Sequence, residues 1–162
     1  NFIYLIREFA KFCALYPNEK LFIFGEGELK KKMINEVAIN KVSQNIKIFD
    51  YTDNIYFYMK KSKAFILSSL WEEPGLVIIE AAMCNSFVIS SNCKRGPEEF
   101  LLKGKAGALF ENNKTGDLTN ILINYLKTGE KSIFEKKVLA KKNCKKFTMF
   151  RHFLKLNKIM NI

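Results

Sequence analysis

The stretch AFILSSLWEEPGLVIIEAAM, residues 64–83, decides the fold, because in it one short apolar run passes through a polar turn into a second one. Ala64-Phe65-Ile66-Leu67 is apolar throughout and bounded by polar residues, which predicts a central strand covered on both faces. Pro74 and Gly75 mark the turn, and Leu76 to Met83 has the length and the alanines of a core helix. We expect the function at this junction, since ligands of parallel sheets collect beyond the carboxyl ends of the strands.

The same alternation of short apolar strands and helical periodicity continues on both sides of this stretch. Strands are expected at 20–24, 45–49, 64–67, 87–91 and 108–110. Helices are expected from the start of the chain to near Pro17, around 29–37, 55–61 and 76–83, briefly from Pro97, and repeatedly after Thr115. This order predicts an α/β fold with one Rossmann-like parallel sheet, helices on both of its sides, and C-terminal helices.

Composition limits the class of protein. The 162 residues are a one-domain length, and 48% hydrophobic with 27% charged residues is ordinary for a globular protein. A net charge of +11 is compatible with nucleic acid, an anionic membrane surface or phosphorylated ligands, or simply with solvated lysine-rich faces. There is no stripe of Lys and Arg interleaved with exposed aromatic residues, so we expect no nucleic-acid partner.

The cysteines and the single histidine indicate no metal site. Cys13, Cys84, Cys93 and Cys144 are scattered without a C-x-x-C pair, and His152 stands alone. We therefore expect no zinc site, no disulfide framework and a reducing, cytoplasmic location. No stretch reads as a signal peptide or as a bilayer-spanning run, so any membrane association is expected to be peripheral.

Three motifs, taken together, resemble a known family. Glu72 and Glu80 are separated by seven residues, with Pro-Gly-Leu-Val between them, after a serine-rich strand end. Residues 95–101, RGPEEFL, and residues 103–110, KGKAGALF, follow at matching distances. The order and spacing closely resemble the retaining glycosyltransferases of family 4, the group 1 type, in which Arg95 would replace the first glycine of a Gly-Gly-x-x-Glu segment.

The resemblance implies an activity and an architecture. Members of the family transfer a sugar from a nucleotide-sugar donor to an acceptor with retention, and they need no metal or other cofactor. They consist of two Rossmann-like domains in the GT-B arrangement, and residues 1–162 look like the second, donor-binding domain, lacking the N-terminal acceptor domain. A UDP-sugar donor, a glycan or lipid-linked acceptor and a role in surface polysaccharide or lipopolysaccharide synthesis at the inner face of the membrane are the corresponding expectations.

The resemblance also implies roles for particular residues. Glu80 would accept hydrogen bonds from the ribose hydroxyls, and Glu72, as the catalytic residue, from a hydroxyl of the transferred sugar. The diphosphate would lie over Gly75, Leu76 and Val77 at the start of the helix. The remaining expected contacts are the Gly25 loop beside the donor, the base near Tyr51, and Glu99 at another side of the pocket.

Each of these residues also has a structural explanation. Glu72 could be a turn acid near a helix N-terminus, Glu99 a first-turn acid after Pro97, and Gly25 part of a tight strand-to-helix turn. Glu80 is harder to explain in this way, because an acid among apolar neighbours is costly unless something pairs with it. A domain that binds a nucleotide sugar or a partner without catalysing transfer is the alternative function.

Overall fold

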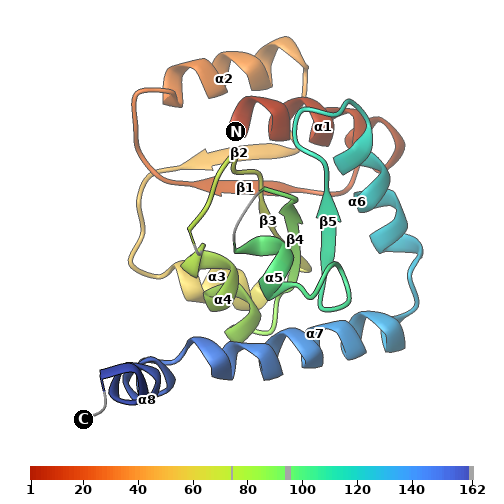
Figure 1. The fold of residues 1–162 in the computed structure, drawn as a ribbon. Helices are drawn as coiled ribbons and strands as arrows, with labels where there is room; N and C mark the ends of the chain where they lie inside the picture. Colours follow the sequence, from red (N-terminus) through yellow and green to blue (C-terminus); the bar gives the residue numbers. More distant parts are fainter. Residues whose placement is uncertain (74, 94–95, 161–162) are drawn as a thin grey trace.

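The computed structural model describes residues 1–73, 75–93 and 96–160, and it confirms the α/β alternation (Figure 1). The strands are β1 (Leu21–Phe24), β2 (Ile46–Phe49), β3 (Ala64–Leu67), β4 (Phe87–Ser91) and β5 (Ala108–Phe110). The helices between them are α1 (Phe2–Leu15), α2 (Lys30–Ile39), α3 (Ile55–Lys61), α4 (Leu76–Met83) and α5 (Pro97–Phe100). The chain ends with α6 (Asp117–Lys127), α7 (Glu130–Cys144), the short 3-10 helix η1 (Lys145–Phe147) and α8 (Met149–Met160).

The strands are parallel, as predicted, but the described residues do not form the expected single sheet. One sheet pairs β1 with β2, and a second has the order β3-β4-β5. No ladder joins β1 to β3, and a cleft of about 630 Å³ lies between them. Hereafter the β1–β3 cleft means this space, which is walled by the two strands and by side chains of α1, α3 and α6.

The division of the sheet also changes the place of β3. The sequence predicts β3 as a central strand covered on both faces, but all four of its residues are only half-buried. β3 is an edge strand, because one side of it borders the β1–β3 cleft. β4 is the central strand of its sheet, and all five of its residues are buried.

Two apolar cores lie on opposite sides of the β3-β4-β5 sheet. Phe87 and Ile89 of β4 belong to the core formed with α1, α2 and α6, whereas Val88 belongs to the core formed with α4, α5 and α7. This alternation follows from the period of two along a strand. Figure 1 shows α7 running beneath α4 and α5, on the side of the molecule away from α1 and α2.

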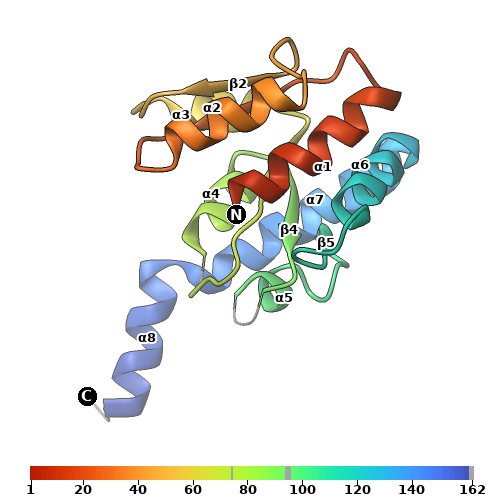
Figure 2. The same ribbon diagram turned by 90° about the horizontal axis from the view of Figure 1, so that it is seen from above.

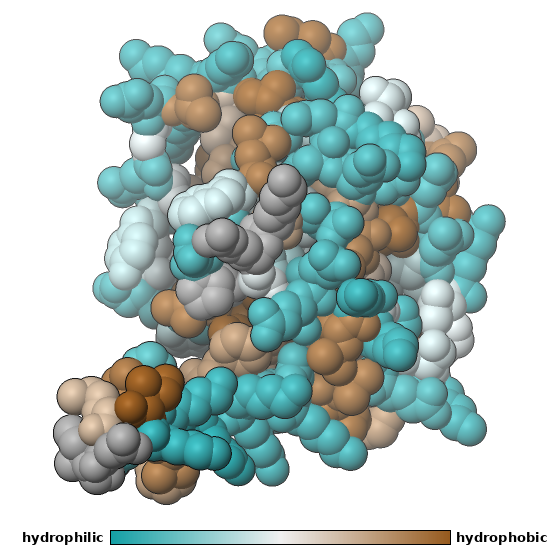
Figure 3. Space-filling view, in the orientation of Figure 1, coloured by the Kyte–Doolittle hydropathy of each residue, from teal (hydrophilic) through white to brown (hydrophobic). Residues whose placement is uncertain are grey.

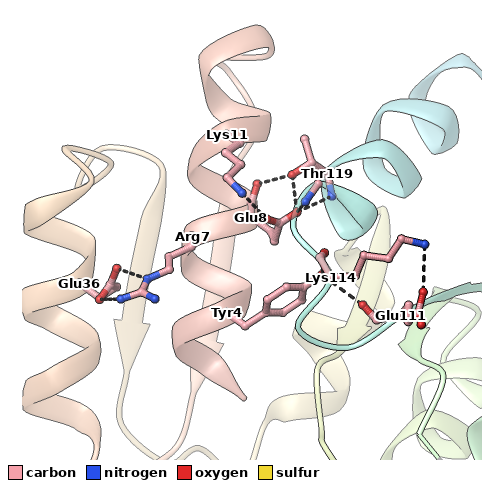
Figure 4. Close-up of polar contacts among 9 residues, drawn as sticks. Tyr4, Arg7, Glu8, Lys11, Glu36, Glu111, Lys114 and Thr119 are labelled. Carbon is pink, nitrogen blue, oxygen red and sulfur yellow. Dashed lines mark hydrogen bonds and ion pairs between the residues drawn. The ribbon is translucent and has the colours of Figure 1, made fainter.

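Polar contacts fix α1 between its neighbours (Figure 4). Arg7 of α1 donates from Nε to Oε1 of Glu36 on α2 at 2.7 Å, and from Nη2 to Oε2 at 3.2 Å. On the other side of α1, the buried Glu8 contacts Thr119 of α6. Helix α1 is therefore tied both to the β1–β2 half through α2 and to the β3–β5 half through α6.

The terminal helix α8 projects from the body of the molecule (Figure 2). Its apolar residues are exposed, Met149, Phe150 and Ile159 among them, and Figure 3 shows apolar and polar side chains together on it at the lower left. From residue 136 to residue 162 the sequence contains lysine and arginine but no aspartate or glutamate. None of the helices in the described part of the chain combines the length and the apolarity that crossing a bilayer requires.

Candidate functional site

The turn between β3 and α4 holds Glu72 in a defined position. Ser69 donates from Oγ to Oε1 of Glu72 at 2.6 Å. Gly75, the residue before α4, is buried with φ of 75°, and a Cβ added there would lie 3.4 Å from Oε2 of Glu72. The carboxylate of Glu72 therefore lies against the start of α4, and only a glycine leaves both the backbone conformation and this approach free.

Glu80 is less buried than the sequence predicts. The buried residues of α4 are Ile78, Ile79, Ala81 and Ala82, whereas Glu80 is half-buried and Leu76, four residues earlier, is exposed. Positions four apart share a helix face, so Glu80 lies on the open side of α4 rather than in its core. Among the described residues its carboxylate has no hydrogen bond or ion pair, which leaves it able to accept hydrogen bonds from a ligand.

The ends of three strands meet at the backbone carbonyl of Ser69. Ser91, the last residue of β4, donates to this oxygen from Oγ at 2.6 Å. Asn112, two residues after β5, donates to the same oxygen from Nδ2, and its own Oδ1 is buried with no hydrogen-bond partner in the described part of the chain. The sequence interpretation assigns no role to these three residues, although each is a polar residue at or just after the end of an apolar strand, which is the available signal.

The start of α1 reaches the same place. Asn1 donates from Nδ2 to Oδ1 of Asn113 at 2.9 Å, in the loop that follows β5. Asn1 also lies near the carboxylate of Glu72. The β3–α4 turn, the β5–α6 loop and Asn1, the residue before α1, thus lie close together.

Gly25 and Tyr51 belong to the other sheet. Gly25 follows β1 and donates its amide to the carbonyl of Phe49 at 3.2 Å. Tyr51 follows β2 and is 71% exposed, and a hydrogen bond with Asp53 raises the pKa of its phenol. Both residues follow the carboxyl ends of their strands, as expected, but within the described residues no hydrogen bond or ion pair connects them to α4.

Glu99 lies on α5, which follows β4. Its side chain is exposed, while Phe100 beside it is buried. Pro74 and Arg95, which belong to the motifs in the sequence, lie outside the described residues. Glu99 therefore follows the end of β4 in the chain, and no described contact joins it to Glu72 or Glu80.

This arrangement suits an anionic ligand that carries hydroxyl groups. A helix of eight residues begins at Leu76, and the free N–H groups and positive dipole end of a helix start attract an anion. Glu72 and Glu80 offer carboxylate oxygens, which accept hydroxyl hydrogens in strong charge-assisted hydrogen bonds. In the ranges 1–73, 75–93 and 96–160, no group of three or more His, Cys, Asp or Glu side chains could hold a metal ion.

Several known proteins are similar to this chain in sequence or in fold. An uncharacterized glycosyltransferase of Methanocaldococcus jannaschii is 42% identical over 100 residues, which are 60% of this chain and 24% of that protein. The poly(ribitol-phosphate) alpha-N-acetylglucosaminyltransferase of Staphylococcus aureus is 28% identical over 120 residues, covering 74% of this chain and 24% of the enzyme. The crystal structure of a mutant of S. aureus TarM in complex with fondaparinux, alpha-GlcNAc-glycerol and UDP superposes with a TM-score of 0.88 at 23% identity, covering 98% of this chain and 32% of that one.

These matches give both the extent of the chain and its family. It spans about a quarter of the length of each of these two relatives and about a third of the TarM chain. The family model described as glycosyl transferases group 1 matches residues 1–146, which is nearly the whole sequence. The chain belongs to the group 1 glycosyl transferases, with the GT-B type of fold.

Proposed function

We propose that this chain is the nucleotide-sugar-binding half of a retaining glycosyltransferase, and that UDP is the nucleotide of its donor. The observation that carries the proposal is the start of α4, where Glu72 lies against Gly75 and the carboxylate of Glu80 has no partner among the described residues. The TarM structure, which shares the fold, was determined with UDP.

In the proposed complex each part of the donor meets a suitable group. The diphosphate lies over Gly75, Leu76 and Val77, where backbone N–H groups and the helix dipole stabilise its charge. Glu80 accepts the ribose hydroxyls, and Glu72, held by Ser69, accepts a hydroxyl of the transferred sugar.

The three remaining predicted contacts surround this core of the site. Gly25 borders the donor, Tyr51 lies near the base, and Glu99 shapes another side of the pocket. Because no described contact joins these residues to α4, their roles rest on their positions after the ends of β1, β2 and β4.

Transfer then depends on electrostatics rather than on a protein nucleophile. As the sugar leaves, negative charge grows on the donor phosphate, and a preorganised helix start stabilises that charge. We propose that the acceptor attacks the anomeric carbon of the sugar on the same face from which the phosphate departs, so that the anomeric configuration is retained. We also propose that no metal takes part.

We infer the class of acceptor from the name of a relative, and the location of the enzyme from the net charge of the chain. The S. aureus relative is named for a poly(ribitol-phosphate) acceptor, and we infer a cell-surface glycan or lipid-linked acceptor for this protein. The net charge of +11 and the basic region after residue 135 suit peripheral contact with the anionic inner face of a membrane. All four cysteines are free, which suits the cytoplasm.

Calorimetric titration of the full-length protein with UDP, GDP and ADP tests the proposal. We expect saturable binding of UDP that is about 10- to 100-fold weaker in Glu80→Ala, the scale of a hydrogen bond to a charged group. Glu135→Ala, an exposed acid on α7, is the matched control and should bind like wild type. Failure of all three nucleotides to bind the full-length protein would overturn the proposal, and binding without sugar transfer would favour the non-catalytic alternative.

A further inference from the structure

Two side chains that follow different strands donate to one oxygen, the backbone carbonyl of Ser69. Ser91 is the last residue of β4 and donates from Oγ at 2.6 Å, and Asn112 lies two residues beyond β5 and donates from Nδ2. A backbone carbonyl oxygen has two lone pairs, so these two donors use its full capacity. The chain that leaves β3 is therefore fixed from the ends of both other strands of the same sheet.

The side chain of Ser69 reaches Glu72. Ser69 donates from Oγ to Oε1 of Glu72 at 2.6 Å, while its carbonyl accepts from Ser91 and Asn112. Only Cα and Cβ separate the Ser69 hydroxyl oxygen from the carbonyl carbon. Fixing the carbonyl therefore limits the hydroxyl to the few positions that staggered rotation about the Cα–Cβ bond allows. The hydrogen bond from Asn112 to Ser69 thus bears on the position of the Glu72 carboxylate.

Asn112 is poorly explained as a residue that stabilises the fold. Its Oδ1 is buried and has no hydrogen-bond partner in the described part of the chain. An unpaired buried acceptor is unfavourable, and its cost offsets much of what the hydrogen bond from Nδ2 contributes to stability. Without Asn112 the Ser69 carbonyl would also keep one donor, Ser91. Because the net gain in stability is small, the position of Asn112 beside the turn that carries Glu72 is the better explanation.

A second asparagine makes the same kind of contact between two helices. Asn143 of α7 donates from Nδ2 to the carbonyl of Phe100, the last residue of α5, at 2.7 Å. Its Oδ1 is also buried with no partner among the described residues. The two asparagines share their chemistry, but Asn143 holds a helix end against the core, whereas Asn112 holds the turn that carries Glu72. Asn143 therefore provides a comparison for the effect of such a contact on stability.

The loop that carries Asn112 is itself held at two points. The amide of Glu111 donates to Oδ2 of Asp117 at 2.7 Å, which ties the end of β5 to the start of α6. Tyr4 of α1 donates from its hydroxyl to the carbonyl of Lys114 at 2.9 Å, which ties the middle of the loop to α1. A side chain can fix a second segment only if its own backbone is fixed. Asn112 meets this condition.

We propose that Asn112 is a positioning residue for the donor sugar and that it acts on Glu72 through Ser69. Its amide holds the Ser69 carbonyl, and the Ser69 hydroxyl then holds the carboxylate that accepts a hydroxyl of the transferred sugar. This inference rests on the proposed function, because it concerns the same carboxylate. Asn112 affects the sugar part of the donor and not the nucleotide part, which Glu80 and the start of α4 bind.

Calorimetric titration of the full-length protein with UDP and with a UDP-sugar tests this role. UDP-glucose and UDP-N-acetylglucosamine are both titrated, and the one that binds more tightly is the probe. Asn112→Ala should lower the affinity for the UDP-sugar about threefold to tenfold, the scale of one net hydrogen bond, and leave the affinity for UDP within about twofold of wild type. Asn120→Ala, at an exposed position of α6, is the control and should bind both ligands like wild type.

The Ser69→Ala protein separates an effect through Ser69 from an independent one. If Asn112 acts through the Ser69 hydroxyl, adding Asn112→Ala to Ser69→Ala should change the affinity for the UDP-sugar by less than about twofold. Two independent effects would instead multiply. Multiplied effects, or an equal loss for UDP and UDP-sugar in Asn112→Ala alone, overturn the proposal.

Two further comparisons separate this proposal from folding effects and from the proposed function. The urea midpoint of Asn112→Ala should fall less than that of Asn143→Ala, whose contact lies in the core. If wild type binds none of the nucleotides, the proposed function and this inference both fail. If Glu72→Ala selectively loses the UDP-sugar and Asn112→Ala binds it like wild type, only this inference fails.

Discussion

The buried carboxylate of Glu8 on α1 is hydrogen-bonded to Thr119 on α6, and both of its oxygens have partners (Figure 4). Thr119 Oγ1 lies 2.8 Å from Oε2 of Glu8, and the amides of Gly116 and Thr119 donate to the same oxygen at 2.9 and 3.3 Å. Lys11 donates to Oε1 at 2.5 Å. Glu8 is only 1% exposed, so these contacts compensate for the burial of its charge.

Removing the hydroxyl of Thr119 should weaken the contact between α1 and α6. We expect Thr119→Val, which keeps the shape of the side chain, to lower the free energy of unfolding by about 1.5 to 3 kcal/mol, the scale of a hydrogen bond to a charged group. Urea unfolding of the two proteins measures this difference. Thr115→Val, at an exposed position of the preceding loop, is the control, and an equal loss in both variants would contradict the role of the contact.

The same carboxylate should make stability depend on pH. Burial is the largest effect on Glu8 and by itself raises its pKa, but the hydrogen bonds from Lys11, Gly116 and Thr119 together outweigh it and lower the pKa below its ordinary value of 4.5. A carboxyl group with a lowered pKa stabilises the folded state fully above its unfolded pKa, and this contribution is lost as the pH falls through the folded pKa. The stability difference between wild type and Glu8→Gln should therefore be constant at neutral pH and shrink below pH 4.5. A difference independent of pH down to 3 would show that the fold does not lower the pKa of Glu8.

The strands were predictable because each is a short apolar run between polar residues. Three of them occupy the residues that the sequence predicts, and the other two, β1 and β2, each begin one residue later than expected. The division of the sheet was not predictable from the same signal, since an apolar run does not specify which neighbour it pairs with. The position of Ala64–Leu67 at an edge is the clearest example.

The candidate site was predictable only where its residues are close in the sequence. Glu72, Gly75 and Glu80 belong to one turn and one helix, so one motif contains them all. Asn112 reaches the carbonyl of Ser69 across 43 positions, and such a contact exists only after β3, β4 and β5 are placed side by side. The exposure of Glu80 depends on which face of α4 packs against α7. The residues around Glu80 in the sequence are uniformly apolar, so they do not indicate that face.

Gly75 should be needed for the site more than for the fold. Gly75→Ala puts a side chain at φ of 75° and within 3.4 Å of Oε2 of Glu72. Gly116→Ala is a matched control, because Gly116 also precedes a helix with positive φ, 84°, but has nothing within 4 Å of an added Cβ. Both variants should lose about 1 to 2 kcal/mol of stability from the left-handed conformation. Only Gly75→Ala should also weaken donor binding in calorimetry, so equal binding by the two variants would argue against a donor site at this turn.

Ser69 should act on the donor through Glu72. Ser69→Ala removes the hydroxyl that donates to Oε1 of Glu72 at 2.6 Å and leaves the Ser69 carbonyl with its bonds from Ser91 and Asn112. We expect affinity for the intact sugar nucleotide to fall about threefold to tenfold, the scale of one net hydrogen bond, with affinity for UDP unchanged. Ser69→Thr keeps the hydroxyl and should restore binding. If Ser69 had only a structural role, Ser69→Ala would instead lower the affinity for UDP and for the sugar nucleotide by the same factor.

Glu72 and Glu80 should divide the recognition of the donor between them. If Glu72 accepts a hydroxyl of the sugar, Glu72→Ala weakens binding of a UDP-sugar by about 10- to 100-fold and leaves UDP within about twofold of wild type. If Glu80 accepts the ribose hydroxyls, Glu80→Ala weakens both ligands by the same factor, because both contain the ribose. Parallel titrations of the two variants, with Glu135→Ala as the exposed control, measure the four affinities. An equal loss for UDP and UDP-sugar in Glu72→Ala would place Glu72 against the nucleotide rather than the sugar, and would remove the reason for assigning it to the reacting part of the donor.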